Sequence, residues 1–318
     1  MTEPKPETQL WNLARGALTT RALGVVADLR IADALAARPR RVEELAREAG
    51  ADANTLHRFL RALASDGVFA EEEPGVFRNT PASELLRREG WDDFAHLFGG
   101  VWHRTAGELD ATTTEPIFAR LFGTDFWSWL ADHPAERAAF DRAMAGGGER
   151  RAEQLAPVEW RDGETVVDVG GGNGALMLEL LERQPGLRAI VFDLPETERD
   201  ETAFGDRCTF VAGSFFDSVP RGDVYVLSAI LHDWDDEHAT RILRNVRAAA
   251  HAGARLLVLD TVLPAGNEPN GAKWLDLLML ALLGGRERTE PEWRALLERG
   301  GFRLERIVDD WLLEASPA

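Results

Sequence analysis

The sequence predicts an α/β fold, a doubly wound and mostly parallel sheet that follows a separate N-terminal helical domain. Five short apolar runs indicate buried strands: ETVVDVG, LRAIVFDL, RCTFVAGSF, DVYVLSAIL and ARLLVLD. Helical patterns such as ALMLELLERQ and HATRILRNVRAAAHAG separate several of them. Strands that alternate with helices are typical of a parallel sheet with helices on both faces. The closing FRLERIVDDWLLEAS predicts two tightly joined strands, so this Rossmann-like sheet should finish with an antiparallel strand.

The N-terminal part has a different rhythm. Residues 8–100 begin with apolar residues at three- and four-residue spacing, which predicts amphipathic helices. The stretch from residue 41 to 86 then predicts helix, turn, helix and a small β-hairpin, the order of a winged helix. Residues 1–100 carry thirteen Lys or Arg and sixteen Asp or Glu, without the basic footprint of a DNA reader. We therefore favour a helical, winged-helix-like dimerisation domain, with a DNA-binding regulator as the alternative.

Composition narrows the classes of function. The 318 residues carry a net charge of −18, which disfavours nucleic acid and anionic membranes as partners. The single cysteine, Cys208, excludes an intramolecular disulfide and a CxxC metal site. The longest apolar run, WLDLLMLALLGG, is about half of a membrane span, and no signal peptide is evident. We expect a soluble, cytoplasmic protein with domains at residues 1–100 and 101–318, of which residues 101–155 form a helical connector.

A glycine-rich loop, VVDVGGGNGAL at residues 166–176, follows the first predicted strand of the sheet. In doubly wound sheets, ligands bind at the carboxyl ends of the strands, where this loop lies. Asp168 stands two residues before the first glycine, where it suits the ammonium group of an amino acid better than a pyrophosphate. Asp193 ends the next strand, where an acid can accept hydrogen bonds from a ribose. The pair favours S-adenosylmethionine over a dinucleotide, and a nicotinamide-dependent reductase remains an alternative.

Five motifs carry a resemblance to a known family. DVGGGNG, FDLP, GSFF, LHDWDDEH and GGRERT occur in this order. The chain resembles the S-adenosylmethionine-dependent O-methyltransferases that include plant caffeic acid and flavonoid enzymes and actinomycete antibiotic-pathway enzymes. The resemblance covers nearly the whole chain and implies a homodimer built through the N-terminal domain. It also implies methyl transfer to a phenolic hydroxyl of a small aromatic molecule of secondary metabolism.

The resemblance implies a set of cofactor-binding residues. These are Gly170, Gly172, Asp193, Ser214, Phe215 and Ser228, to which the residue pattern of the loop adds Asp168. Gly170 and Gly172 would line the cofactor loop, and Asp193 would hold the ribose. Ser214 and Phe215 would flank the adenine, although many members have an acid in place of Ser214. Ser228 would lie near the methionine end of the cofactor. The short segment between Asp193 and Gly213 should leave the adenine side of the pocket more open.

The same resemblance implies three catalytic positions. His232 matches the general base of the family, and Glu287 matches one of two acids that support it. Asp260 stands where plant members have the second acid, a glutamate. A phenol with a pKa near 10 meets a histidine with a pKa near 6.5, so the base must act as the oxygen attacks the methyl group. No metal is expected in this mechanism.

The stretch HDWDDEH also allows a metal site or a solvated helix start. His232 and His238 are six residues apart, about 600° around a helix, so they do not share a face. We expect Asp235 to cap a helix, with the following acids near its positive end.

The resemblance places Met144 and Met279 at the acceptor, in a pocket to which the connector contributes, with packing in the core as the alternative for both methionines. We also expect Asp233 to touch the acceptor. One further alternative keeps the fold and S-adenosylmethionine but carries out chemistry other than methyl transfer.

Overall fold

The computed structural model describes residues 5–88, 90–145, 148–195, 197 and 205–318. They divide into two compact units. The first unit consists of Met1–Gly107 and Ala135–Gly146, and the second consists of Glu108–Pro134 and Gly147–Ala318. The predicted domain boundary at residues 100 and 101 stays a prediction. Within the described residues, no helix is both long enough and apolar enough to cross a membrane.

The first unit is mainly helical and contains one small sheet. Its elements are α1 (Pro6–Ala14), α2 (Gly16–Asp28), α3 (Ile31–Ala34), β1 (Arg40–Arg41), α4 (Val42–Ala49), α5 (Ala53–Ser65), β2 (Phe69–Glu73), β3 (Val76–Asn79), α6 (Pro81–Leu85), α7 (Trp91–Gly99), α8 (Val101–Ala106) and α11 (Pro134–Ala145). The hairpin of β2 and β3 pairs with β1 in an antiparallel sheet of order β1-β3-β2. The predicted order of helix, turn, helix and hairpin is present in α4, α5, β2 and β3.

The second unit holds the large sheet. Its elements are α9 (Ile117–Phe122), α10 (Phe126–Asp132), α12 (Gly148–Gln154), β4 (Thr165–Val169), α13 (Ala175–Arg183), β5 (Arg188–Asp193), η2 (Gly205–Arg207), β6 (Cys208–Ala212), β7 (Val224–Ser228), η3 (Leu231–Asp233), α14 (Asp236–Ala249), β8 (Arg255–Leu259), β9 (Val262–Leu263), α15 (Ala272–Leu282), β10 (Arg288–Thr289), α16 (Glu290–Arg299), β11 (Phe302–Val308) and β12 (Leu312–Pro317).

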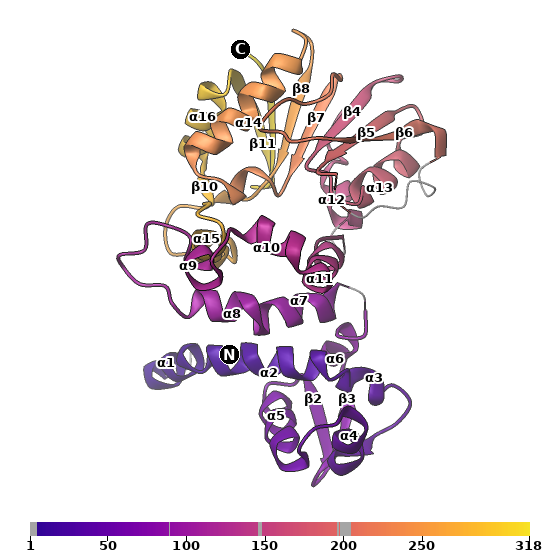
Figure 1. The fold of residues 1–318 in the computed structure, drawn as a ribbon, viewed down its shortest axis with the longest axis vertical. Coiled ribbons are helices and arrows are strands. Elements are labelled where there is room, and N and C mark those ends of the chain that lie inside the picture. The colour runs from indigo at the N-terminus through magenta and orange to yellow at the C-terminus, as the bar shows by residue number, and fades with distance from the viewer. Residues whose placement is uncertain (1–4, 89, 146–147, 196, 198–204) are drawn as a thin grey trace. The chain divides into compact units, whose positions relative to one another are not determined.

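The order of the seven strands is β11-β12-β8-β7-β4-β5-β6. The five strands from β8 to β6 are parallel and lie side by side in Figure 1. β12 runs antiparallel to β8, and β11 runs antiparallel to β12. The predicted α/β class, with its antiparallel finish, is confirmed. The chain continues from β4 to β5 on one side, and β7 flanks β4 on the other, so the topological switch point lies between β4 and β7.

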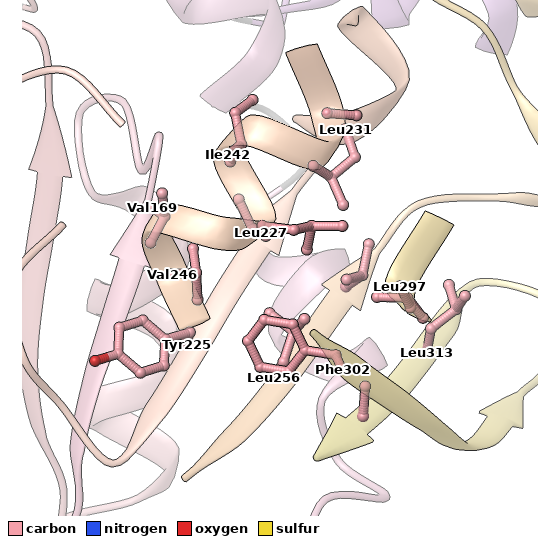
Figure 2. Close-up of a cluster of buried hydrophobic side chains, with 14 of the residues drawn as sticks. Val169, Tyr225, Leu227, Leu231, Ile242, Val246, Leu256, Leu297, Phe302 and Leu313 are labelled. Atoms are coloured by element: carbon pink, nitrogen blue, oxygen red, sulfur yellow. The ribbon is translucent and has the colours of Figure 1, made fainter. Parts of the chain in front are cut away.

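The two faces of this sheet bury alternate residues of each strand, as the pleat requires. Val167 and Val169 pack in the cluster that includes α14 and α16, whereas Val166 packs with α12 and α13. Figure 2 shows the first cluster, where strand residues meet Ile242 and Val246 of α14. Leu231 is fully buried in the same cluster. The residue that precedes His232 is therefore anchored in the core.

Candidate active site

The glycine loop leaves β4 at the switch point. Gly170 and Gly172 have φ angles of 75° and 59°, which residues with a side chain rarely adopt. The amide of Gly170 donates a hydrogen bond of 2.8 Å to the carbonyl oxygen of Phe192, so the loop is tied to the end of β5. A Cβ added at Gly170 would lie 2.5 Å from the Ile230 side chain. The loop and the segment after β7 are therefore in close contact.

Asp168 lies beneath this loop at the carboxyl end of β4. Its exposed fraction is 1%, and its Oδ2 has no hydrogen-bond partner among the described residues. Burial raises its pKa to about 7, the charge of Asp193 adds to the increase, and Arg151 opposes it. A Cβ at Gly171 would lie 2.7 Å from Asp168 Oδ2, so the carboxylate directly faces the loop backbone. A buried carboxylate with an unused oxygen suits a cationic ligand.

Arg151 on α12 is a residue that the sequence analysis missed. Burial lowers the pKa of its guanidinium, while the charges of Asp168 and Asp260 act to raise it. It therefore provides a partly buried positive charge near two of the predicted site acids. Its sequence neighbourhood, GERRAEQ, is an ordinary charged helix, and no local signal distinguishes Arg151 from Arg150.

Asp193 ends β5 and holds the loop from the other side. Its Oδ2 accepts a hydrogen bond of 2.7 Å from the Gly172 amide. Its Oδ1 accepts one of 2.7 Å from the Leu194 amide and one of 2.8 Å from the Thr197 hydroxyl. An ionised carboxylate has about four lone-pair positions, so acceptor capacity is left for a ribose. The segment between Asp193 and Gly213 was predicted to be short and to open the pocket, and residues 196 and 198–204 of it lie outside the described residues.

The predicted adenine side follows β6. The Ser214 hydroxyl accepts a hydrogen bond of 3.2 Å from the Phe216 amide, so it stabilises the turn itself. The rings of Phe215 and Trp234 meet edge to face, with centroids 6.0 Å apart. This aromatic contact joins the predicted adenine side to the segment that carries His232.

The carboxyl end of β7 leads directly to His232. Ser228 is the last residue of the strand, and its hydroxyl has no hydrogen-bond partner among the described residues. Ala229 has a φ angle of 54°, in the left-handed region that costs free energy for a residue with a Cβ. This sharp turn ends the strand and starts the single 3-10 turn η3, which contains His232.

His232 lies among three carboxylates. Its Nδ1 is 2.7 Å from Glu287 Oε1 and 3.8 Å from Asp260 Oδ1. Its Nε2 is 3.4 Å from Asp233 Oδ1. Glu287 and Asp260 are 2% and 4% exposed, and the three predicted catalytic residues are brought together from three distant segments. The closest contact, with Glu287, orients the ring and leaves Nε2 as the nitrogen that faces away from it.

The carboxylates change the acid–base properties of the imidazole. Burial lowers the pKa of His232, but the charges of Asp260 and Asp233 and the hydrogen bond with Glu287 outweigh it and raise this pKa to about 10. Burial raises the pKa of Asp233 to about 7 and that of Asp260 to about 6, and the charge of His232 opposes both shifts. The imidazole of His232 is therefore a stronger base than a histidine with a pKa near 6.5, which the sequence led us to expect.

The remainder of HDWDDEH begins a helix, as predicted. Asp235 caps α14, and its Oδ1 accepts a hydrogen bond of 2.9 Å from the His238 amide. His238 is exposed, and its ring contacts Asp235 on its own helix. Within the part of the chain that the structure describes, no group of three or more His, Cys, Asp or Glu residues is arranged to hold a metal ion.

The predicted acceptor residues lie on separate elements. Asp233 adjoins His232, and Met279 is buried on α15. Asp276 of the same helix accepts a hydrogen bond of 2.8 Å from the Glu287 amide, which links α15 to the support of the base. Met144 lies on α11, in the first unit. Their contact with an acceptor stays a prediction.

This geometry defines a class of protein. A glycine loop above a buried acid, next to a histidine held by carboxylates, is the arrangement of a group-transfer enzyme that uses a cationic nucleoside cofactor and a general base. The unused oxygens of Asp168 and Ser228 and the spare acceptor capacity of Asp193 fit S-adenosylmethionine.

The sequence also matches two models of known protein families. Residues 102–303 match the O-methyltransferase domain, and residues 11–89 match the O-methyltransferase dimerisation domain. The chain belongs to the S-adenosylmethionine-dependent O-methyltransferases.

Two proteins with similar sequences illustrate this membership. The phenazine O-methyltransferase PhzM of Lysobacter antibioticus is 42% identical over 312 residues, which cover 94% of this chain and 92% of that protein. The 3-amino-4-hydroxybenzoate 4-O-methyltransferase of Streptomyces cremeus is 37% identical over 315 residues, which cover 94% of this chain and 86% of that protein.

A solved structure extends the comparison. NcsB1 of neocarzinostatin biosynthesis, in complex with S-adenosyl-L-homocysteine and 1,4-dihydroxy-2-naphthoic acid, is 34% identical with a TM-score of 0.81, covering 94% of this chain and 96% of that one.

Proposed function

We propose that this enzyme methylates a phenolic hydroxyl of a small aromatic metabolite, with His232 as the general base. The observation that carries the proposal is the 2.7 Å contact between His232 Nδ1 and Glu287 Oε1. A carboxylate at Nδ1 holds the proton on that nitrogen and leaves Nε2 to accept a proton from the substrate. The pKa of His232, raised to about 10, is close to that of an ordinary phenol, so proton transfer to the neutral imidazole is nearly balanced, and the fraction of neutral imidazole should increase as the pH rises toward 10.

The cofactor supplies a methyl group that is activated on a sulfonium. Asp168 would bind its ammonium group, because this carboxylate is buried and has an unused oxygen. The positive charge of Arg151 would receive its carboxylate, and Asp193 would bind the ribose. Gly170 and Gly172 would line the loop, Ser214 and Phe215 would flank the adenine, and Ser228 would lie near the methionine end. Glu287 and Asp260 would stabilise the imidazolium that forms when His232 takes the proton.

Two relatives support an aromatic acceptor. One is named for 3-amino-4-hydroxybenzoate, and NcsB1 was solved with a dihydroxynaphthoic acid. Asp233 would contact the acceptor hydroxyl, because it lies 3.4 Å from His232 Nε2. Met279 would pack against the flat ring with its thioether.

The enzyme would act as a homodimer. The match to a dimerisation domain supports this, as do exposed apolar side chains on α1 and α2, where Leu10, Trp11, Leu13 and Leu18 are each more than 60% exposed. An apolar surface of this kind on a folded unit is typical of an interface between protein chains. Light scattering coupled to size-exclusion chromatography should therefore give the mass of two chains.

Calorimetry and one variant test the proposed function. Titration with S-adenosylhomocysteine should show micromolar binding, and NADH should not bind. A panel that includes 3-amino-4-hydroxybenzoate and 1,4-dihydroxy-2-naphthoic acid should then yield a methylated product by mass spectrometry. His232→Gln should lower kcat by about 10²- to 10⁴-fold and leave S-adenosylhomocysteine binding intact. Full activity in His232→Gln would rule out the role given to this residue.

A further inference from the structure

The turn that carries His232 has few hydrogen bonds of its own. It consists of the three residues of η3, between the left-handed Ala229 and the start of α14. Within the turn, the Trp234 amide donates to the Leu231 carbonyl oxygen at 3.4 Å, longer than a usual amide hydrogen bond. A segment this short needs partners from elsewhere to keep one conformation.

The guanidinium of Arg288 provides these partners. Its Nη1 donates a hydrogen bond of 2.8 Å to the Leu231 carbonyl oxygen, and its Nη2 donates one of 2.8 Å to the Trp234 carbonyl oxygen. Its Nε donates one of 3.0 Å to Asp236 Oδ1 at the start of α14. One planar group thus binds the chain immediately before His232, two residues after it, and at the following helix.

Arg288 is itself held in place. Its exposed fraction is 0%, and its guanidinium lies 5.3 Å from the centre of the Trp293 ring. Its backbone belongs to β10, which pairs in parallel with β9 through the register of Arg288 with Val262. Burial of a cation requires a matched set of acceptors, and here they are a carboxylate and three carbonyl groups, the third being that of Arg286 at 3.3 Å from Nη1. All three nitrogen atoms of the Arg288 guanidinium donate hydrogen bonds, which indicates a specific structural role rather than general packing.

The residues just before Arg288 contact the same turn. The Arg286 amide donates a hydrogen bond of 2.8 Å to the His232 carbonyl oxygen. A Cβ added at Gly285 would lie 2.1 Å from that oxygen, so only glycine allows this approach. Glu287, between Arg286 and Arg288, places its carboxylate on His232 Nδ1. The segment from 285 to 288 therefore carries both the partner of the imidazole and the side chain that holds the turn.

We propose that Arg288 is a positioning residue that sets the contact between His232 and Glu287 by holding the backbone on both sides of the imidazole. Its fork of donors reaches both carbonyl groups at once, which the single ammonium of a lysine cannot reproduce. The expected effect of Arg288 on kcat rests on the proposed role of His232 as the general base. The structural consequence, a fixed environment of the imidazole, can be measured without substrate or cofactor.

The test compares Arg288→Lys and Arg288→Met with Arg299→Met. Arg299 is a matched control, because its Nη2 binds Asp236 Oδ2 at 2.8 Å, and among the described residues its exposed side chain makes no hydrogen bond to the turn of His232. The readout is the pH titration of the His232 ring resonance in histidine-labelled free protein. The chain has seven histidines, and the spectrum of His232→Gln assigns the resonance. Asp236→Ala is a second route, since it removes the Nε partner if the Arg288 variants do not fold.

Wild type and Arg299→Met should share a His232 titration with a pKa far above 6.5. In the Arg288 variants, a looser contact with Glu287 should lower the proton affinity of His232 at least tenfold, and in Asp236→Ala several-fold. With an acceptor found in the panel, Arg288→Lys should lower kcat at least tenfold, while its Kd for S-adenosylhomocysteine changes less than threefold. Identical titrations in wild type and every folded variant would overturn the proposal. A wild type that binds no S-adenosylhomocysteine would instead refute the proposed function and leave the titration result standing.

Discussion

The buried charged groups at the two ends of the site differ in the partners that the protein gives them. At the end of β4, Asp168 is buried with one carboxylate oxygen that has no hydrogen-bond partner among the described residues. Beyond the end of β7, His232 has a carboxylate within 3.4 Å of each ring nitrogen. A cationic ligand would complete the first group, whereas the imidazole of the second already has protein partners, although Glu287 Oε2 and both Asp260 oxygens lack hydrogen-bond partners among the described residues. Asp168 and His232 therefore differ in which groups stabilise them, although both lie at the same edge of the sheet.

The difference has an energetic consequence. A buried charge without a partner destabilises the free protein, and a cationic ligand restores that free energy when it binds. A charge already held by protein groups does not need the ligand, so its geometry is ready before the substrate arrives. Substitutions at Asp168 should therefore act on ligand affinity, and substitutions around His232 should act on the rate of the chemical step.

Among the variants that keep His232 and compare the two ends of the site, the largest effect should come from Glu287→Gln, which removes the negative charge at His232 Nδ1. A hydrogen bond to a charged group contributes about 1.5–3 kcal/mol, so kcat should fall about 10- to 100-fold. The Kd for S-adenosylhomocysteine should stay unchanged. The pKa of His232 should fall from about 10, so the rise of kcat with pH should move to lower pH. Steady-state kinetics from pH 6 to 10 provides the measurement. A changed Kd for S-adenosylhomocysteine with an unchanged kcat would contradict the expected separation between ligand affinity and the rate of the chemical step.

Asp168→Asn should produce the converse result. Loss of the charge that would bind the ammonium group should weaken S-adenosylhomocysteine about 10-fold or more, while kcat at saturating cofactor stays within threefold. Because the pKa of Asp168 is raised to about 7, the folded state of wild type binds this proton more tightly than the unfolded state. Wild type should therefore lose stability relative to Asp168→Asn as the pH rises from about 4 to 7. Thermal melts of the two free proteins at pH 5 and 8 check the sign.

A pH dependence of binding should follow from the same group. Protonation of Asp168 competes with the cationic end of the ligand, so the Kd of wild type for S-adenosylhomocysteine should rise up to about tenfold per pH unit below pH 7. In Asp168→Asn this part of the dependence should disappear between pH 6 and 8. Calorimetry in buffers of different ionisation enthalpy would detect the released proton, and equal slopes in both proteins would assign the effect to another group.

The smallest effect should come from Ser228→Ala. Its hydroxyl has no hydrogen-bond partner among the described residues, so its removal should leave the melting temperature unchanged. If the hydroxyl contacts the methionine end of the cofactor, the Kd for S-adenosylhomocysteine should rise about threefold, the effect of one modest neutral hydrogen bond. A lower melting temperature with unchanged Kd would place Ser228 in the structural framework instead.

The sequence predicted the parts of the fold and site that depend on neighbouring residues. The strands that alternate with helices, the loop at Gly170 and the cap at Asp235 are all encoded by short contiguous patterns. The resemblance selected Asp260 and Glu287, which the structure brings to His232 although separate segments carry them. The two-residue pairing of β9 with β10 leaves no periodic signal, because each strand is too short to alternate.

Two arginines, one buried and one partly buried, show why the remaining part of the site was not predicted. Arg288 lies within the GGRERT motif, and Arg151 lies on the charged helix α12, yet neither position has a role that is evident from the sequence. Both derive their properties from burial among carbonyl groups or carboxylates of distant segments. In sequence, each resembles any other surface arginine of this chain. Their importance depends on tertiary contacts, which no local pattern contains.

The burial of Leu231 has a consequence for how the enzyme fails on heating. Catalytic side chains on exposed loops can be lost through local opening while the rest of a protein stays folded. Here the neighbour of His232 is an integral part of the packed cluster between the sheet and α14. The base cannot leave its place without opening that cluster, so inactivation and cooperative melting should occur over the same temperature range.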